Sequence, residues 1–251
     1  PLTFANSTDA KHSKTAAGNS GSISFTDGND NSFLSHLGFM PQGMDFYRNF
    51  TAKDYIKYIM ALKKYSPDNA DEYALSVLDR VNLHSDADKK IGAFSGGMKQ
   101  RLGIAQAIVG EPKVLIFDEP TAGLDVEARN EILDLLRDYA AEDENRTILI
   151  TSHIASDLEH LCDDIYLIHG GKQLLHEETD VILEQYGLIK ADEAQYAALD
   201  KEYLLGSRKE PYGYACLTND RKYYEENVPD LVVERAGIDD VILMMTGGEK
   251  R

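Results

Sequence analysis

The chain has 251 residues, of which 43% are hydrophobic, and it carries 26 Lys and Arg against 43 Asp and Glu, a formal net charge of −17. This length and apolar content fill the core of one large domain, or of one domain with a smaller appendage. A nucleic-acid partner is disfavoured, because attraction to a phosphate backbone needs clustered Lys and Arg. The same charge also fits a well-solvated acidic surface with no binding role.

The two cysteines, Cys162 and Cys216, lie far apart without a C-x-x-C or Cys/His spacing, so neither a disulfide framework nor a zinc site is indicated. No stretch approaches the roughly 18 consecutive apolar residues that span a bilayer, and the first residues lack the basic and apolar pattern of a signal peptide. We therefore expect a soluble chain in the reducing cytosol.

The first forty residues carry weak structural signals. Residues 1–22 are small and polar with no sustained hydrophobic period, so we expect an irregular or disordered segment. Short strands are expected at 22–25, SISF, and at 36–40, HLGFM, with a turn-rich stretch between them.

A helical insert is expected over about residues 44–95, and it contains two amphipathic helices. The first begins after Thr51, a suitable N-cap with Asp54 three positions on. The second begins after Asn69, with Glu72 completing a capping-box pattern. The expected buried stripes are Tyr55, Ile56, Ile59 and Leu62 on the first helix, and Tyr73, Ala74, Val77, Leu78 and Val81 on the second.

The middle of the chain alternates between helix and strand. Residues 95–97 open a helix to about Val109, and the apolar run KVLIF, 113–117, follows as a buried strand. Another helix starts at Asp125, and RTILITSH, 146–153, is again an apolar strand. Strand, helix and strand in succession imply a parallel sheet. The inward face of the second of these helices is expected to comprise Ile132, Leu135, Leu136 and Tyr139.

The last part of the chain is expected to hold a hairpin and a small appendage. DDIYLIHGGKQLLH, 163–176, predicts two antiparallel strands that turn at Gly170 and Gly171, where glycine accepts a positive φ. A short helix is expected at 180–186. The expected domains are an irregular segment at 1–22, a core at 23–187 and a small α/β accessory domain at 188–251.

The run VLIFDEP, Val114 to Pro120, places two adjacent carboxylates just past the carboxyl end of a buried strand, where ligands bind in open α/β sheets. Asp118 is a candidate ligand for Mg²⁺, directly or through water, and Glu119 is a candidate general base for an attacking water. Strand ends also carry acidic turn residues, so an isolated Asp-Glu pair would be equally compatible with a turn.

Three flanking features favour the catalytic interpretation. Ser95, Gly96 and Gly97 in FSGGM give an exposed helix N-terminus that suits a phosphate, although the serine alone fits an ordinary N-cap. Asp125 in AGLD follows the carboxylate pair along the chain. His153 ends the next strand, where an imidazole can reach a γ-phosphate or the attacking water.

Together these residues resemble the ATP-binding-cassette (ABC) ATPases over about residues 20–185. The signature motif of that family is matched by FSGGM rather than the commoner LSGGQ, so the polar contact of the last side chain is lost. Gln42 in MPQ is similar to the glutamine loop, which senses magnesium and contacts the transmembrane partner. The other matched motifs are the second Walker motif at Asp118 and Glu119, the D-loop at Ala122–Asp125 and the switch histidine at His153.

This resemblance implies ATP and Mg²⁺ as ligands. The residues it assigns are Asp118 and Gln42 to the metal, Ser95, Gly96, Gly97, Gln42 and Asp125 to the nucleotide, and Glu119 and His153 to catalysis. It implies a sandwich dimer with a second ATPase subunit, and separate transmembrane subunits docked on the helical insert. The implied location is cytoplasmic, peripheral on the inner face of the cell membrane. The implied fold is an α/β P-loop NTPase-like core, a mixed sheet with flanking helices, followed by the small appendage.

A phosphate loop with the pattern G-x-x-x-x-G-K-[ST] is not found in the sequence. The nearest string, TDAKHSKT at 8–15, keeps Lys14 and Thr15 but lacks both glycines. Too few residues follow it for a three-turn helix before Ser20, and residues 1–3 are too few for the preceding strand. We therefore expect Lys14 to be a solvated charge and the N-terminal strand-loop-helix unit of the fold to be missing.

Three explanations of the missing loop stay open: a truncated or mis-specified chain, which we favour, a degenerate subunit that donates its signature to a partner's site, and an interaction protein that hydrolyses nothing. The sequence is best interpreted as an ATP-hydrolysing exporter subunit that is weak or inactive alone. The alternative is a non-hydrolysing regulatory or interaction module on the same fold. Chromosome-maintenance ATPases and two-cassette translation factors share the fold, but this chain has neither heptads nor a second cassette.

Overall fold

The computed structural model describes residues 2–5 and 36–247. The chain divides into two compact units, one of residues 5–152 and the other of residues 1–4 with 153–251. The domain boundaries expected from the sequence stay a prediction. Among the helices of the described residues, none has both the length and the apolar character that a membrane crossing requires.

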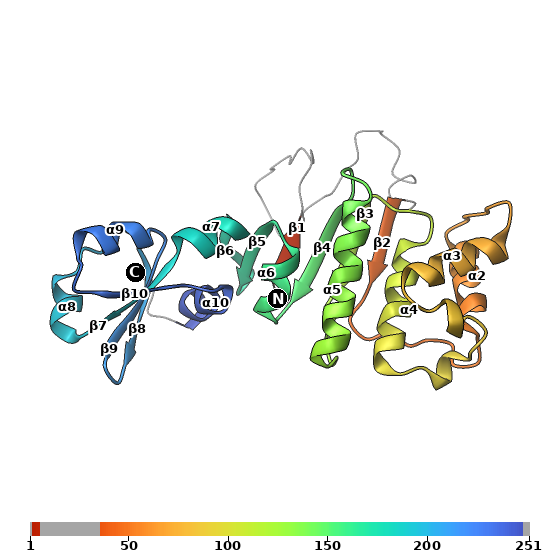
Figure 1. Ribbon diagram of the computed structural model, residues 1–251, viewed down its shortest axis with the longest axis horizontal. Coiled ribbons are helices and arrows are strands. Elements are labelled where there is room, and N and C mark those ends of the chain that lie inside the picture. The colour runs from red at the N-terminus through yellow and green to blue at the C-terminus, as the bar shows by residue number, and fades with distance from the viewer. Residues whose placement is uncertain (1, 6–35, 248–251) are drawn as a thin grey trace. The chain divides into compact units, whose positions relative to one another are not determined.

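The unit of residues 5–152 contains three parallel strands, β2 (Leu37–Met40), β3 (Val114–Asp118) and β4 (Thr147–Ser152), which Figure 1 shows with β3 in the middle. The parallel arrangement predicted from the sequence is confirmed. Because the three strands run in the same direction, their carboxyl ends lie at one edge of the sheet.

Helix α4 (Gly96–Ile108) packs closely on β2. A Cβ added at Gly38 would lie 2.3 Å from the carbonyl oxygen of Ala107, so only glycine fits this contact. Helix α4 begins and ends close to the residues expected, and Gly110 follows it with a φ of 82°. This contact fixes the helix that carries the FSGGM motif to the edge strand of the sheet.

Helix α5 (Val126–Ala141) joins β3 to β4 along the chain. Its buried side chains are Ile132, Leu133, Leu136 and Tyr139, while the expected Leu135 is half-buried and Leu133, which was not expected, is buried. Both leucines flank the same stripe on a helical wheel, and the packing partner, not the period, decides which of them is buried.

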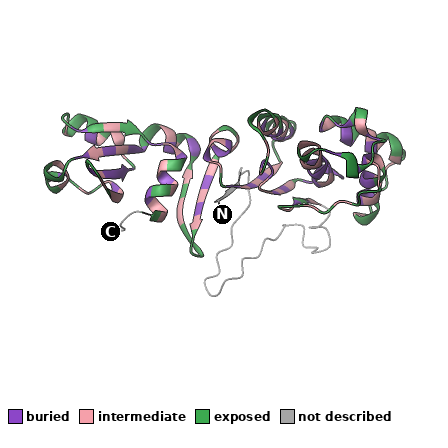
Figure 2. Cartoon of the chain, turned by 90° about the horizontal axis from the view of Figure 1, so that it is seen from below, coloured by how far each residue is buried: buried purple, intermediate pink, exposed green. Residues whose placement is uncertain are grey.

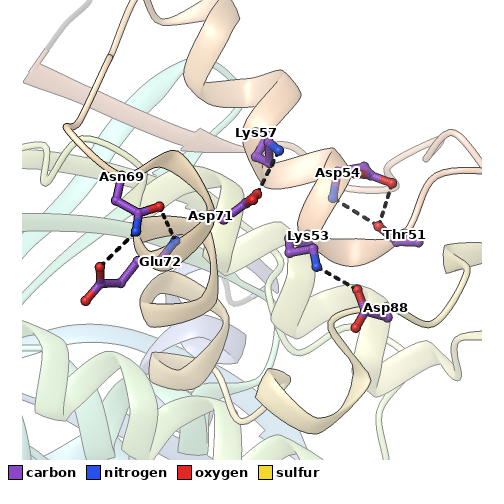
Figure 3. Close-up of polar contacts among 8 residues, drawn as sticks. All are labelled: Thr51, Lys53, Asp54, Lys57, Asn69, Asp71, Glu72 and Asp88. Atoms are coloured by element: carbon purple, nitrogen blue, oxygen red, sulfur yellow. Dashed lines mark hydrogen bonds and ion pairs between the residues drawn. The ribbon is translucent and has the colours of Figure 1, made fainter.

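The two helices expected in the insert are confirmed as α2 (Ala52–Leu62) and α3 (Ala70–Arg80). Figure 3 shows their predicted N-caps: the Thr51 side chain accepts a hydrogen bond from the amide of Asp54, and the Asn69 side chain accepts one from the amide of Glu72. The Glu72 carboxylate accepts from the Asn69 side-chain amide over 3.1 Å, in place of the backbone contact of a capping box.

Leu62 is the other correction to the expected stripes, because it is 62% exposed. The buried side chains of α2 are Ala52, Tyr55, Ile56, Ile59 and Met60. Helix α2 ends at Leu62, and the Nζ of the next residue, Lys63, donates to the carbonyl oxygens of Ala107 and Val109 at 3.3 and 2.8 Å. The chain turns beside the end of α4 at this point, and Leu62 faces solvent. Figure 2 colours the buried residues of the chain purple and the exposed ones green.

Two exposed ion pairs connect α2 to neighbouring segments (Figure 3). Lys57 pairs with Asp71 of α3 at 2.7 Å, and Lys53 pairs with Asp88 at 2.8 Å. Asp88 lies between two short 3₁₀ turns, His84–Asp86 and Ile91–Ala93. Because solvent screens these charges, the pairs define local geometry more than they stabilise it.

The second unit contains the predicted hairpin of β5 (Asp164–His169) and β6 (Lys172–Glu178), with Gly170 and Gly171 at φ of 57° and 73°. A further strand, β1 (Leu2–Ala5), pairs antiparallel with β5. The irregular structure expected at 1–22 is therefore wrong at residues 2–5, and whether this strand precedes a phosphate loop stays a prediction. Pairing with β5 supplies the partner that so short a segment lacks by itself.

Helices α6 (Ala155–Leu161) and α7 (Thr179–Gln185) flank the hairpin along the chain, and α7 is the short helix that the sequence predicts. The following elements are β7 (Gly187–Ala191), α8 (Glu193–Ala198), β8 (Leu204–Glu210), β9 (Gly213–Thr218), α9 (Arg221–Asn227) and β10 (Val232–Arg235). The strand order is β10-β7-β9-β8, and every neighbouring pair is antiparallel. This is the split βαβ arrangement of ferredoxin-like domains.

This four-stranded sheet is covered on both faces. One face carries an apolar core that includes Ile189, Cys216 and the fully buried Tyr224. On the other face lies helix α10 (Ile238–Gly247), where a Cβ added at Gly206 would stand 3.1 Å from a carbonyl oxygen of that helix. The mixture of helix and strand expected for this part of the chain is present.

Two expectations fall on residues that the structure does not describe. They are the strand at 22–25 and the partial phosphate-loop string at 8–15. Both stay predictions, as does most of the irregular segment expected at 1–22.

Candidate nucleotide site

The carboxyl edge of the parallel sheet carries three of the candidate residues, and a fourth follows it along the chain. Gln42 lies in an exposed turn after β2, with Gly43 at a φ of 70°. Asp118 ends β3 and Glu119 follows it, and both are half-buried. His153 directly follows β4 and is exposed, but it begins the other compact unit. Its approach to Glu119 therefore stays a prediction.

A threonine on the neighbouring strand joins the two acidic residues. The Oγ1 hydroxyl of Thr151 donates to Oδ1 of Asp118 over 2.6 Å and accepts from the amide of Glu119 over 3.1 Å. The Glu119 amide also donates to the carbonyl oxygen of Thr151, again over 3.1 Å. These contacts follow from the register, because Asp118 and Thr151 stand opposite each other in the ladder between β3 and β4.

Glu119 has a φ of 51°, in the left-handed region that residues with a Cβ seldom occupy. The next residue is Pro120, and a residue before proline is normally pushed toward extended backbone. The amide of Ala122 donates to the carbonyl oxygen of Glu119 over 3.1 Å and closes the turn. Lys64, Asn82 and Glu111 share this conformation, and at Glu119 it places backbone strain directly after Asp118.

The sequence interpretation missed Thr151. The pattern of the segment predicts only an apolar strand, in which a threonine is an ordinary β-forming residue. The signal that could have found it is position: it is a polar residue near the carboxyl end of a strand that neighbours the strand of Asp118. Only the register shows that the two side chains are level.

The predicted phosphate-binding position at the start of α4 is accessible. Ser95 is exposed and caps the helix, because its Oγ accepts from the amide of Met98 over 3.3 Å. Among the described residues, no atom beyond its chain neighbours and its own helix backbone lies within 4 Å of where a Cβ would stand on Gly96. Free approach to a helix N-terminus is what a phosphate needs.

Asp125 has a structural role that the sequence also predicts. Its Oδ1 accepts from the amide of Ala128 over 2.9 Å and caps α5. Its assignment to the nucleotide stays a prediction. Gln100 of α4 donates to the carbonyl oxygen of Ala122 over 3.5 Å, so the helix that begins with the FSGGM motif contacts the turn after Glu119.

The donor set suits a magnesium ion that is held mainly by a nucleotide. In the part of the chain that the structure describes, no group of three or more His, Cys, Asp and Glu side chains could hold a metal by itself. Magnesium in nucleotide sites keeps several waters and takes one or two carboxylates together with phosphate oxygens. Asp118 fits this role, because the hydroxyl of Thr151 orients its carboxylate through Oδ1.

Comparison with known proteins identifies the family. A family model described as ABC transporter matches residues 10–122. The ABC transporter ATP-binding protein YxlF of Bacillus subtilis is 32% identical over 207 residues, which are 82% of this chain and 68% of that protein. This chain belongs to the ABC transporter ATP-binding family.

Other ABC relatives match over a shorter stretch. The Nod factor export ATP-binding protein I of Rhizobium sp. (strain N33) is 33% identical over 150 residues, 60% of this chain and 49% of the relative. The bacitracin transport ATP-binding protein BcrA of Bacillus licheniformis is 41% identical over 150 residues, 58% of this chain and 46% of the relative. The chain thus spans about half the length of these two relatives.

Solved structures of ABC proteins have a similar fold. The ATP-binding subunit of an ABC transporter aligns with a TM-score of 0.52 at 25% identity, over 62% of this chain and 64% of that one. A transporter described as metal-chelate type, in an inward-facing conformation, aligns with a TM-score of 0.52 at 22% identity, over 72% and 71% of the two chains. The predicted ABC ATPase fold class is confirmed.

Proposed function

We propose that this ABC ATP-binding protein hydrolyses ATP to drive export through separate transmembrane subunits. The observation that carries the proposal is the pair of carboxylate residues at the end of β3, held by the hydroxyl of Thr151. Asp118 would bind Mg²⁺, with Gln42 as a further contact, and Glu119 would accept a proton from the attacking water. His153 would assist at the γ-phosphate.

A bound Mg²⁺ would supply charge neutralisation at the β- and γ-phosphates, which is its usual part in phosphoryl transfer. The residues of this chain do the remaining work in the proposal. Thr151 and the turn at Pro120 keep Asp118 and Glu119 in place before the nucleotide arrives. Such preorganisation lowers the barrier because no protein group has to move as charge develops.

The direction of transport rests on relatives. The names of the similar proteins refer to Nod factor export, lantibiotic transport and bacitracin transport. We extend the exporter role to this chain as a proposal and assign no cargo. Docking would take place at the cytosolic face of the membrane, and the insert with α2 and α3 would contact the transmembrane subunits.

The second half of each site would come from another ATPase subunit, identical or different. The start of α4, with Ser95 and Gly96 exposed and Gly97 half-buried, suits a phosphate that approaches from outside the chain. Asp125 would lie beside the same nucleotide. The dimer is therefore part of the proposal, with one subunit's helix N-terminus facing the nucleotide of the other.

A non-hydrolysing regulatory module is the second candidate function. It is favoured by one observation, the absence of a G-x-x-x-x-G-K-[ST] string from the sequence. The family model nevertheless begins its match at residue 10, so the match includes Lys14 and Thr15. The two functions differ in whether phosphate is released.

The test compares phosphate release and nucleotide binding by the purified protein with those of Glu119→Gln. We expect slow, Mg²⁺-dependent release that falls by about 10²–10⁴-fold in Glu119→Gln, because a positioned general base contributes that much, while binding persists. Glu127→Gln, an exposed glutamate in the first turn of α5, is the control and should not change the rate. Binding without release in either protein would favour the regulatory module, and equal release by both would overturn the assignment of Glu119.

A further inference from the structure

The hydroxyl of Thr151 contacts both Asp118 and Glu119. A hydroxyl has one proton to give and lone pairs that accept. Its proton goes to Oδ1 of Asp118 over 2.6 Å, and a lone pair receives the amide of Glu119 over 3.1 Å. The three groups form a directed chain, in which each bond polarises the next.

We propose that Thr151 is a positioning residue of the nucleotide site: its hydroxyl orients the metal-binding carboxylate of Asp118 and holds Glu119 in its left-handed conformation. This inference rests on the proposed function for the roles of the two acidic residues. The geometry of the hydrogen bonds does not depend on it.

The strained backbone at Glu119 requires stabilising hydrogen bonds from outside its own turn. A left-handed residue with a side chain is disfavoured, and the following Pro120 disfavours it further. The amide of Glu119 has two acceptors on one residue, the carbonyl oxygen and the hydroxyl of Thr151, each at 3.1 Å. Loss of the hydroxyl removes one of them and also removes the hydrogen bond to Oδ1 of Asp118.

A purely structural role for Thr151 predicts a different response from a positioning role. As a residue of β4, threonine contributes a β-branched shape that valine reproduces, so a structural role tolerates valine. Serine lacks that shape but keeps the hydroxyl. A positioning role therefore tolerates serine and fails with valine, which is the opposite order.

The experiment compares Thr151→Val and Thr151→Ser in the complete chain, with Thr147→Val as the matched control. Thr147 begins the same strand, and valine there keeps the β-branched shape. The first measurement is hydrogen exchange of the Glu119 amide by NMR without nucleotide. The second is binding of a fluorescent ATP analogue in Mg²⁺ and in EDTA.

We expect the Glu119 amide to exchange faster in Thr151→Val than in the wild type. We also expect this variant to lose about 10- to 100-fold of the affinity gained from Mg²⁺, because that is the usual effect of removing a group that orients a metal ligand. Binding in EDTA should be unchanged. Thr151→Ser should restore both properties, and Thr147→Val should leave both as in the wild type.

The inference is overturned if Thr151→Val gains as much nucleotide affinity from Mg²⁺ as the wild type and exchanges the Glu119 amide as slowly. It is also overturned if Thr151→Ser loses more of the affinity gained from Mg²⁺ than Thr151→Val does. A wild type that binds no nucleotide in either condition would overturn the proposed function instead. In that case the amide exchange still decides whether Thr151 holds Glu119, because that measurement requires no ligand.

Discussion

Polar residues are distributed differently along the parallel strands β2, β3 and β4 and along the antiparallel strands β7 to β10. In β3 the polar residue comes last, at Asp118, and β4 carries Thr151 next to its final residue. In β8 three charged residues, Arg208, Lys209 and Glu210, follow one another along the strand. Buried parallel strands keep their polar residues at their ends, including Thr147 at the start of β4, whereas strands with exposed positions carry them along their length. Only the first pattern directs attention to the carboxyl ends of the strands, where ligands bind.

The largest expected effect tests the parallel sheet. Phe117 is fully buried in β3 and precedes Asp118, so Phe117→Ala should lower the free energy of unfolding by about 3–5 kcal/mol and also weaken Mg²⁺-dependent nucleotide binding. Urea denaturation followed by circular dichroism measures the first effect. Val126→Ala, at a position 65% exposed, is the control and should change stability by about 0.5 kcal/mol or less. A loss below about 1 kcal/mol in Phe117→Ala would contradict the burial that we describe.

Tyr224→Ala is the corresponding change in the antiparallel sheet. Tyr224 is fully buried and its hydroxyl donates to the carbonyl oxygen of Asp200 over 2.8 Å, so we expect a loss of about 3–5 kcal/mol with nucleotide binding unchanged. Tyr224→Phe removes only the hydrogen bond and should cost about 1 kcal/mol. If Tyr224→Ala impairs nucleotide binding as much as Phe117→Ala does, nucleotide binding does not depend on the parallel sheet in particular.

Sequence alone predicted the parallel region well, because its signals are local. Caps at Thr51, Asn69, Ser95 and Asp125 are set by one side chain and an amide three residues on, and all four are observed. The motif spacing likewise places Asp118 and Glu119 at a strand end without knowledge of the tertiary fold.

The features that the sequence did not predict depend on contacts between residues far apart along the chain, which no local pattern contains. Thr151 acquires its role only through register with Asp118, and the exposed Leu62 and buried Leu133 are decided by what packs beside them. In the antiparallel region, tyrosines and charges along the strands give a weak alternation, so the βαββαβ order could not be derived. The strand at residues 2–5 depends entirely on its partner β5.

Two glycines allow a matched steric test of the regions. A Cβ at Gly38 would stand 2.3 Å from the carbonyl oxygen of Ala107, and one at Gly213, where φ is 140°, would stand 2.2 Å from that of Ala191. Each change to alanine should cost about 1–3 kcal/mol, because backbone must move. Gly170→Asn, in a turn where a left-handed residue is exposed, is the control and should be nearly neutral. Thermal unfolding measures all three, and a neutral Gly38→Ala would contradict the close packing of α4 on β2.

Alkaline titration should affect both regions in the same way. Burial raises the pKa of four tyrosines to about 12: Tyr55 and Tyr73 in one unit, Tyr186 and Tyr224 in the other. Because the folded pKa lies above the ordinary tyrosine pKa of about 10, these groups contribute stability that is full below pH 10 and is lost as pH rises toward 12. Tyrosinate absorbance with circular dichroism measures the loss, which Tyr186→Phe should reduce. A stability that stays constant across this range would contradict the burial of these rings.

The smallest effect concerns the thiols of the second unit. Burial raises the pKa of Cys216 to about 11 and that of Cys162 further, so both should react slowly with iodoacetamide near neutral pH. The rate at Cys216 should rise about tenfold per pH unit below its pKa. Cys216 lies in the same core as Tyr224, so Tyr224→Ala should accelerate its modification. An unchanged rate in that variant would show that the antiparallel core had not opened.

The most direct test of the account is the Mg²⁺ dependence of nucleotide binding by Asp118→Asn. The amide keeps the shape and the contact with Thr151 but removes the charge that a cation needs. We predict that the wild type binds a fluorescent ATP analogue more tightly in Mg²⁺ than in EDTA, and that Asp118→Asn binds it equally in both, while Asp134→Asn on the exposed face of α5 behaves as the wild type. If Asp118→Asn retains the full gain from Mg²⁺, the carboxyl edge of the parallel sheet is not the metal-nucleotide site.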